Sequence, residues 1–357
     1  MYNYKNNKII AIGDIHGDYE IFIELLKMSK VIDKNLNWIG KDTYVVQLGD
    51  TLDGKRPDTV LEKSFIDLTG EIEITNLILS LDKKARKYGG RVISILGNHE
   101  LYPYYYYNDK SFNEKYVKTA DLNKYKKLYK LSRFKYYKPG KGAGAKLFGR
   151  TRPFLLQLGQ FLFCHGSISS SFVKECIKNN MMQKKSKSNY FVKRNNNNNK
   201  TKTKTKTKTK IKTKTKIKQK FNLYVDINKI NKQVADWLIG NSRKVPFFIN
   251  NDDGSNPLFN RELTNPHYLN KEDCKRLVTN VLKYFKNTKY LVMGHSTHKN
   301  ICTLCNDTVY RTDIAISRAF GETFIKNMNR LQVLEIKQKN GKVETSIITP
   351  KGKRKIL

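Results

Sequence analysis

The sequence predicts an α/β protein with buried sheets, and two observations predict it. Short apolar runs with the length of strands alternate along the chain with longer segments whose apolar residues recur at helical spacing. The chain has 357 residues and is 39% hydrophobic, which is enough for one large core or two modest ones. Alternation of this kind is typical of α/β proteins.

Five apolar runs have the length of buried strands. They are IIAIG at residues 9–13, YVVQLG at 44–49, VISILG at 92–97, FLFC at 161–164 and YLVMG at 290–294. Near the end of the chain, RLQVLEIKQ at 330–338 and VETSIIT at 343–349 predict a final pair of strands.

The segments between the strands predict helices. One apolar face is formed by Ile74, Leu77, Ile78, Leu81 and Ala85, and another by Ile227, Ile230, Val234 and Trp237. A helical cap region is expected over about 101–150. The tyrosine run YPYYYY at 102–107 either lines a substrate cleft or packs the start of this cap.

One segment interrupts the pattern with sequence of low complexity. Between Lys184 and Lys220 the chain has fifteen lysines, one arginine and no acidic residue, so this window supplies 16 of the net charge of +38. Such a segment lacks the apolar residues that offset the entropy of ordering, so we expect residues 183–220 to be a disordered insert. It divides one domain into two parts, 1–182 and 221–357. Its cations either contact nucleic acid or acidic surfaces non-specifically, or they reflect a neutral expansion of simple sequence.

Composition argues against other classes. No apolar run approaches the roughly 18 residues of a membrane span, and the N-terminus shows no secretory signal. Five cysteines, an odd number, favour a reducing, cytoplasmic setting over a disulfide framework. Cys302 and Cys305 have zinc or redox spacing without a second pair, and we expect them in a hairpin.

Polar side chains follow the ends of all five apolar strands. They are Asp14 and His16, Asp50, Asn98 with His99, His165, and His295. Ligands gather at the carboxyl ends of strands in open α/β sheets, so these groups are expected to meet. Taken singly, the aspartates and the asparagine could cap turns, and His165 could be a satisfied core histidine. Together, their mixed oxygen and nitrogen donors suit two divalent ions such as Mn²⁺, Fe²⁺ or Zn²⁺.

The same groups carry a family resemblance. GDIHG, GD-x-x-D, GNHE, HG and GH follow one another at 13–17, 49–53, 97–100, 165–166 and 294–295. With RTRPFLLQLGQFLFCHGSIS (150–169), NPLFNRE (256–262) and RTDIAISRAFG (311–321), they resemble the phosphoprotein phosphatase branch of the calcineurin-like metallophosphoesterases, most of all the bacterial-type Shewanella-like phosphatases. The resemblance covers nearly the whole chain except the insert. It implies a four-layer sandwich of two mixed β-sheets flanked by helices.

The resemblance also implies roles for individual residues. A first metal ion would be held by Asp14, His16 and Asp50, and a second by Asn98, His165 and His295, with Asp50 bridging the two. His99 would be the general acid that protonates the leaving oxygen, and Asp53 would hydrogen-bond and orient it. Whether His298 binds a metal stays open, because Thr297 stands where many relatives have a second histidine.

The chain departs from the family where a phosphate-binding arginine is expected. Relatives have Asp-Arg-Gly where this chain has Asp53-Gly54-Lys55-Arg56, so the arginine is shifted by two positions or lost. We predict that Arg56 replaces it, because Gly54 lets the backbone turn and the arginine fork reaches far. In the alternative, Arg56 faces solvent. Arg261 is the first and Arg318 the second further candidate for gripping the phosphate.

These residues predict a metal-dependent phosphoric monoester hydrolase. The expected activity is that of a protein phosphatase, on Ser/Thr or Tyr, in which a metal-bridging hydroxide attacks the phosphate in line. The expected partner is a phosphorylated protein or a small phosphoester, and no membrane. One alternative is a nucleotide or dinucleoside polyphosphate hydrolase on the same fold; another is a weakly catalytic protein that binds nucleic acid through its insert.

Overall fold

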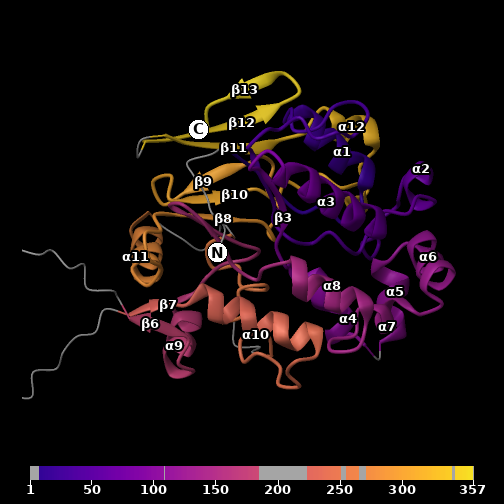
Figure 1. Cartoon of the computed structure of the whole chain (residues 1–357). Helices are drawn as coiled ribbons and strands as arrows, with labels where there is room; N and C mark the ends of the chain where they lie inside the picture. Colours follow the sequence, from indigo (N-terminus) through magenta and orange to yellow (C-terminus); the bar gives the residue numbers. More distant parts are fainter. Residues whose placement is uncertain are drawn as a thin grey trace, which may run out of the picture.

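Two large sheets lie face to face and helices cover their outer sides, as the computed structural model shows (Figure 1). It describes residues 8–107, 109–184, 223–250, 255–264, 271–339 and 342–356. The expected α/β sandwich of two mixed sheets is therefore confirmed. From residue 185 onward the predicted disordered insert lies outside the described residues, so its disorder stays a prediction.

The first sheet has six strands in the order β13-β12-β11-β1-β2-β3. Its strands are β1 (Ile9–Ile12), β2 (Tyr44–Gln47), β3 (Arg91–Ser94), β11 (Val333–Lys339), β12 (Lys342–Thr349) and β13 (Gly352–Arg354). The first three run parallel, and β11 pairs antiparallel with both β1 and β12. The first three predicted strands and the final strand pair thus share one sheet.

The second sheet has five strands in the order β4-β5-β8-β10-β9. Its strands are β4 (Leu156–Leu158), β5 (Phe161–Cys164), β8 (Tyr290–Met293), β9 (Cys302–Leu304) and β10 (Val309–Arg311). The strands β5, β8 and β10 run parallel, whereas β4 and β9 pair antiparallel at the two edges. The parallel strands therefore form one end of the first sheet, β1 to β3, and the centre of the second, β5, β8 and β10.

Alternation along β5 shows how the two sheets pack. Phe161 and Phe163 join the core that contains the first sheet, whereas Leu162 and Cys164 join a second core under the helices. Successive side chains of a strand point to opposite faces, so β5 contributes to both cores. The run FLFC is buried throughout for this reason.

Helices cover both outer faces. Against the first sheet lie α1 (Tyr19–Met28) and α3 (Glu71–Arg86), with the short α2 (Lys63–Ile66) and α12 (Phe324–Met328) nearby. The core beneath the second sheet includes residues of α8 (Ala143–Thr151), α9 (Ser170–Lys178), α10 (Ile227–Ile239) and α11 (Lys271–Leu282). The predicted apolar faces lie inward in both α3 and α10.

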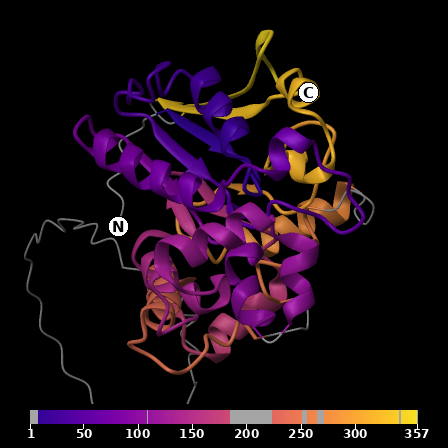
Figure 2. The same cartoon turned by 90° about the vertical axis from the view of Figure 1, so that its right-hand side faces the viewer.

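The predicted cap region is helical. It consists of α4 (Asn98–Tyr105), α5 (Lys110–Tyr116), α6 (Thr119–Tyr129), α7 (Arg133–Tyr136) and α8. Figures 1 and 2 both place these helices and α10 in the half of the molecule opposite β11 to β13. The cap thus begins at α4, directly after β3, where two predicted site residues, Asn98 and His99, lie.

The ends of the undescribed insert lie side by side. β6 (Met182–Lys184) pairs antiparallel with β7 (Leu223–Val225), and Lys184 is opposite Leu223. A chain that leaves and returns at neighbouring points can be inserted there without stretching the rest of the domain. The expected start of the insert at residue 183 falls inside β6.

The expectation that the cysteines are reduced is wrong for one pair, whereas the expected hairpin is present. Cys302 does lie in the expected hairpin of β9 and β10, but Cys305 forms a disulfide with Cys274 of α11. Their Cα atoms are 5.3 Å apart, a separation that suits a disulfide. An odd number of cysteines does not exclude such a pair, and the fold brings together two residues that are 31 positions apart.

Among the described helices, none has the length and apolar character that crossing a membrane requires.

Candidate active site

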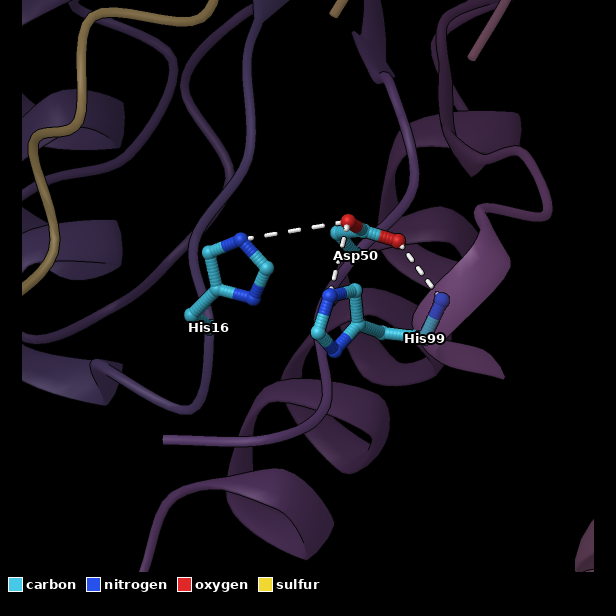
Figure 3. A group of neighbouring side chains, drawn as sticks. All are labelled: His16, Asp50 and His99. Atoms are coloured by element: carbon cyan, nitrogen blue, oxygen red, sulfur yellow. Dashed lines mark hydrogen bonds and ion pairs between the residues drawn. The ribbon is translucent and has the colours of Figure 1, made fainter. Parts of the chain in front are cut away.

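Side chains from the ends of β1, β2, β3, β5 and β8 meet between the two sheets and the cap. Asp50, after β2, lies at their centre and is 2% exposed. The Asp50 carboxylate is 3.8 Å from Nε2 of His16 and 3.7 Å from Nε2 of His99, and 3.3 Å from Nε2 of His165. Figure 3 shows the rings of His16 and His99 side by side, both directed toward the carboxylate of Asp50. The predicted meeting of strand ends therefore takes place around Asp50.

The backbone at this centre has an unusual conformation. His16, Asp50, Asp53 and His295 all have positive φ angles, between 44° and 68°. This left-handed region is uncommon for residues other than glycine, and such strain concentrates at functional sites. The surrounding hydrogen bonds hold it in place; for example, the Asp50 carbonyl accepts from the N–H of His16 at 2.9 Å.

Two glycines allow the carboxylates to approach closely. A Cβ atom on Gly97 would collide with the carboxylate of Asp50, and one on Gly294 would collide with that of Asp14. Glycine is required at both positions because any side chain would occupy the space of a candidate ligand.

Backbone carbonyls orient two of the histidines. Nδ1 of His16 is 3.1 Å from the carbonyl of Leu52, and Nδ1 of His165 is 2.7 Å from that of Leu48. If Nδ1 of His16 donates a proton to its carbonyl, the opposite nitrogen, Nε2, faces Asp50 as an acceptor. Histidines that bind metals are commonly held in this way.

The remaining predicted ligands complete the cluster. The carboxylate of Asp14 accepts from the backbone N–H of His295 at 3.1 Å, which joins β1 of the first sheet to β8 of the second. Oδ1 of Asn98 is 2.8 Å from Nε2 of His165, and the amide nitrogen of Asn98 donates to the hydroxyl of Tyr102. All six predicted ligands therefore lie in one buried group.

The electrostatics of this group fit divalent cations. Burial, and after it the nearby carboxylates of Asp313 and Asp50, raise the pKa of Asp14 well above its usual value, so a cation beside this carboxylate would stabilise its charged form. Burial and neighbouring cationic groups hold the pKa of both His16 and His295 well below the usual value, so both rings are neutral, as metal binding requires. Burial opposes the charge of His165, but Asp50 outweighs it and raises the pKa.

Geometry defines two ligand groups that share Asp50. One contains His16, Asp50 and His99, the other Asp50, His165 and His295, and the candidate ligand atoms of each lie within 4.8 Å of one another. A shared carboxylate with oxygen and nitrogen neighbours on both sides suits a pair of metal ions. The ligand set expected from the sequence for the first metal ion contains Asp14, whereas the group defined by distance contains His99 instead.

His99 has a second contact that sets it apart from the other histidines. Its Nδ1 is 2.8 Å from Oδ2 of Asp53, a carboxylate with no exposure to solvent. The other oxygen of Asp53 accepts from Arg133 at 2.6 Å. A histidine whose partner is a buried carboxylate keeps one ring nitrogen occupied and presents the other, here Nε2, to the site.

The three predicted arginines occupy different positions. Nη2 of Arg56 lies 2.6 Å from Nε2 of His16, so the side chain reaches the cluster. Nη1 of Arg261 donates to the carbonyl of His295 and to the hydroxyl of Ser296, both at 2.9 Å. The guanidinium of Arg318 is buried and bound to both carboxylate oxygens of Asp18, at 2.9 and 2.6 Å. The structure thus brings two of the three arginines to the cluster.

His298 is not part of either ligand group. Burial and the nearby Arg311 lower its pKa to about 4, and its buried Nε2 has no hydrogen-bond partner among the described residues.

Comparison with known proteins decides the family. The family model of the calcineurin-like phosphoesterases matches residues 7–299. The chain belongs to this family. The resemblance found in the motifs is therefore confirmed, and the protein is a hydrolase of the metallophosphoesterase type.

Relatives of this phosphoesterase are named as phosphatases. It is 28% identical over 318 residues to Shewanella-like protein phosphatase 1 of Plasmodium berghei (strain Anka), an alignment that covers 87% of this chain and 68% of that protein. It is 34% identical over 97 residues to Shewanella-like protein phosphatase 2 of Arabidopsis thaliana, covering 27% of this chain and 22% of that protein.

A solved structure shares the fold. The crystal structure of a cold-active protein-tyrosine phosphatase of a psychrophile, Shewanella sp., superposes with a TM-score of 0.63 over 99% of this chain and 81% of that chain, at 18% identity. At this identity the match supports the architecture of the phosphoesterase described above.

Three residues of this phosphoesterase site were missed by the sequence reasoning. Glu100 accepts from the backbone N–H groups of Asp50 and Thr51, each at 2.8 Å, and so fixes the turn after β2. Arg133 and Glu71 surround Asp53 from the cap side and from α3. Glu100 is the last residue of the GNHE motif, so its position in the motif could have identified it as a candidate. Arg133 and Glu71 carry no such signal, because only the folded cap brings them near His99.

Proposed function

We propose that this phosphoesterase is a two-metal phosphomonoesterase that dephosphorylates proteins. The observation that supports this most strongly is the position of Asp50 between two histidine groups, with the His99–Asp53 pair on one side. Isolated carboxylates and histidines occur in many cores, but this combination provides both a place for cations and a proton donor.

The six expected ligands would hold the two ions. Asp14, His16 and Asp50 form one set, and Asn98, His165 and His295 join Asp50 in the other. Divalent ions bound there supply Lewis acidity that activates water and neutralises phosphate oxygens. Hydrogen bonds from Nδ1 of His16 and of His165 to the carbonyls of Leu52 and Leu48 hold the two rings in position beside Asp50.

His99 is proposed as the general acid. With an Nδ1–H directed at Asp53, its ring would donate a proton from Nε2 to the leaving oxygen. Asp50 lies 3.7 Å from the same Nε2, so the proton donor and the shared metal ligand face one space. An acid beside the metal pair acts on the leaving group, which is where negative charge develops as the phosphate ester breaks.

Arg56 and Arg261 are proposed to bind the phosphate. Arg56 lies against His16 and also stacks over Phe320, with 4.8 Å between its guanidinium carbon and the ring centre. Nε2 of His16 accepts either this arginine or a metal ion, so Arg56 would turn toward the substrate oxygens when an ion is bound. Arginine's fork matches a phosphate better than the ammonium of Lys55.

Aromatic rings beside the proposed acid favour phosphotyrosine over phosphoserine. The ring of Tyr102 lies 4.2 Å from that of His99, and Phe259, which is 37% exposed, stacks at 6.1 Å on Tyr102. A phenyl leaving group would find apolar faces there, whereas a serine side chain would not. This pattern supports a protein-tyrosine phosphatase as the finer assignment.

The test compares substrates with the full chain loaded with Mn²⁺, Fe²⁺ or Zn²⁺. We expect turnover of p-nitrophenyl phosphate and a higher kcat/KM for phosphotyrosine peptides than for phosphoserine peptides of the same sequence. Higher activity on nucleotides or dinucleoside polyphosphates would favour the alternative hydrolase. Absence of turnover with every metal and substrate would contradict the proposal. Contact with nucleic acid is not proposed, because the insert that suggested it lies outside the described residues.

A further inference from the structure

Asp53 is held from two sides, and His99 accounts for one of them. Oδ2 of Asp53 is 2.8 Å from Nδ1 of His99, and Oδ1 accepts from Nη2 of Arg133 at 2.6 Å. Asp53 and the side chain of Arg133 have no exposure to solvent, so water does not compete for these contacts. The orientation of the carboxylate therefore depends on both neighbours together.

Arg133 is fixed in turn by a second carboxylate. Its Nε donates to Oε2 of Glu71 at 2.7 Å, and its Nη2 donates to Oε1 at 3.0 Å. Glu71 also accepts from the backbone N–H of Asp53 at 2.8 Å and from the hydroxyl of Tyr125 at 2.9 Å. Glu71 thus binds the arginine and the backbone of the aspartate that the arginine contacts, which closes a ring of three residues.

The contacts match the properties of an arginine. A guanidinium presents several N–H donors in one plane, and here Nε and Nη2 make three hydrogen bonds that bridge the carboxylates of Glu71 and Asp53. Burial opposes the charge, but the carboxylates of Asp53 and Glu71 outweigh it and raise the pKa of Arg133 well above its usual value. A lysine would keep the charge but could not hold both carboxylates in the same plane.

We propose that Arg133 is a positioning residue of the phosphatase reaction, which holds Asp53 so that Asp53 orients His99 toward the leaving oxygen. The inference rests on the proposed function, since it concerns the acid of that reaction. The cap then takes part in the chemistry, because α7 contributes the charged side chain that orients the proton donor through Asp53. A purely structural role, in which Arg133 only fastens the cap to α3, is the competing explanation.

The two explanations differ in how the leaving group matters. A phenolate leaving group has a conjugate acid with a pKa of about 10 and needs the proton, whereas 2,4-dinitrophenolate leaves readily without one. A defect in the acid therefore slows phenyl phosphate far more than 2,4-dinitrophenyl phosphate. A loss of fold or of metal slows both equally.

The experiment measures kcat/KM for both substrates in the full-length protein and its variants. For Arg133→Met we expect a loss of about tenfold or more with phenyl phosphate and less than about threefold with 2,4-dinitrophenyl phosphate. Arg133→Lys should recover part of the loss and keep the same selectivity, and it serves as the test if Arg133→Met does not fold. In a His99→Asn background, Arg133→Lys should cause no further loss, because the residue it acts through is gone.

Arg318→Met is the matched control. Arg318 is also buried and bound to both oxygens of an aspartate, Asp18, but that aspartate does not contact His99. Any loss it causes should be equal for the two substrates. Equal losses for the Arg133 variants, or a full additional loss in the His99→Asn background, would overturn the inference.

Failure of the proposed function would look different. If the parent protein hydrolyses neither ester, or if His99→Asn itself shows no leaving-group selectivity, the acid assignment fails and Arg133 loses its role with it. If His99→Asn is selective and the Arg133 variants are not, the proposed function stands and the inference about Arg133 is wrong.

Discussion

The two sides of Asp50 are held in place by different forces. Toward β5 and β8, the histidines are fixed by the backbone: Nδ1 of His165 lies 2.7 Å from the carbonyl of Leu48, and Nε2 of His295 lies 3.3 Å from that of Phe259. Toward the cap, His99 is fixed by charged side chains, through Asp53 and Arg133. Backbone contacts persist as long as the sheets do, whereas buried ion pairs depend on every partner being present.

The two sides should therefore respond differently to substitution. On the side of β5 and β8, called the metal side below, the ligand geometry follows from the strand ends. A substitution there removes its own ligand and leaves the others in place. On the cap side, called the acid side below, a substitution at Asp53 or Arg133 leaves a buried charge without its partner. The effect then reaches His99 through its neighbours.

The largest effect is expected where both sides meet. Asp50→Asn should lower kcat/KM by a factor on the order of a thousand or more, because the shared carboxylate of both metal groups loses its charge. Steady-state kinetics with p-nitrophenyl phosphate measures this, with circular dichroism as the control for folding. A loss below about tenfold would remove Asp50 from the centre of the site.

The acid side should show a smaller and more selective loss. His99→Asn should reduce kcat by a factor on the order of a hundred, the scale of a general acid, and Asp53→Asn should have a weaker effect of the same kind. Comparison of kcat for phenyl phosphate in the parent and both variants checks this. Turnover within threefold of the parent in His99→Asn would exclude it as the acid, and an Asp53→Asn variant indistinguishable from the parent would break the proposed pair.

Arg56→Ala should cost less than the loss of the acid. If Arg56 binds the phosphate, transition-state stabilisation should fall by about 2 kcal/mol, with a higher KM and weaker inhibition by free phosphate. Arg318→Ala should not change phosphate inhibition, because the guanidinium of Arg318 is already bound to Asp18. If phosphate inhibits the Arg56 variant as strongly as the parent, the shifted arginine has no role at the substrate.

The smallest effect on turnover is expected for a buried acid deeper in the cap. Burial and the nearby Glu71 raise the pKa of Asp121 to about 7, so the folded state binds this proton more tightly than the unfolded state does. Its contribution to the free energy of unfolding is complete below about pH 4 and is lost as the pH rises through about 7. Asp121→Asn, which does not ionise, should flatten this decline in urea unfolding curves and leave turnover within about threefold.

A decline as steep in the variant as in the parent would show that Asp121 does not control cap stability. Asp226→Asn is a matched control, since Asp226 also accepts a backbone N–H at the start of a helix but lies at the surface.

The sheet and the metal cluster could be predicted because their information is local. Each ligand follows an apolar run by one to three residues, and parallel strands bring such positions to one edge. Asp14, Asp50 and His165 were found in this way, and the structure places all three in one buried group.

The acid side could be predicted only in part. Asp53 is three residues from Asp50, so the motif contains it. Arg133 is 80 positions from Asp53, and the helices between them carry many cations that resemble it in sequence. Burial and pairing distinguish Arg133 from these, and both are properties of the fold. The same limit applies to Arg318, because its position in the motif RTDIAISRAFG does not show that its guanidinium binds Asp18.

The most direct test of the account is the metal content of the chain, measured by elemental analysis after loading with Mn²⁺ and removal of unbound metal. If Asp50 is the shared ligand of a metal pair and His99 is an acid, the parent and His99→Asn should each retain two ions per chain, and Asp50→Asn should retain one or none. A parent that binds no more than one ion, or a His99→Asn variant that loses an ion while Asp50→Asn keeps both, would contradict it.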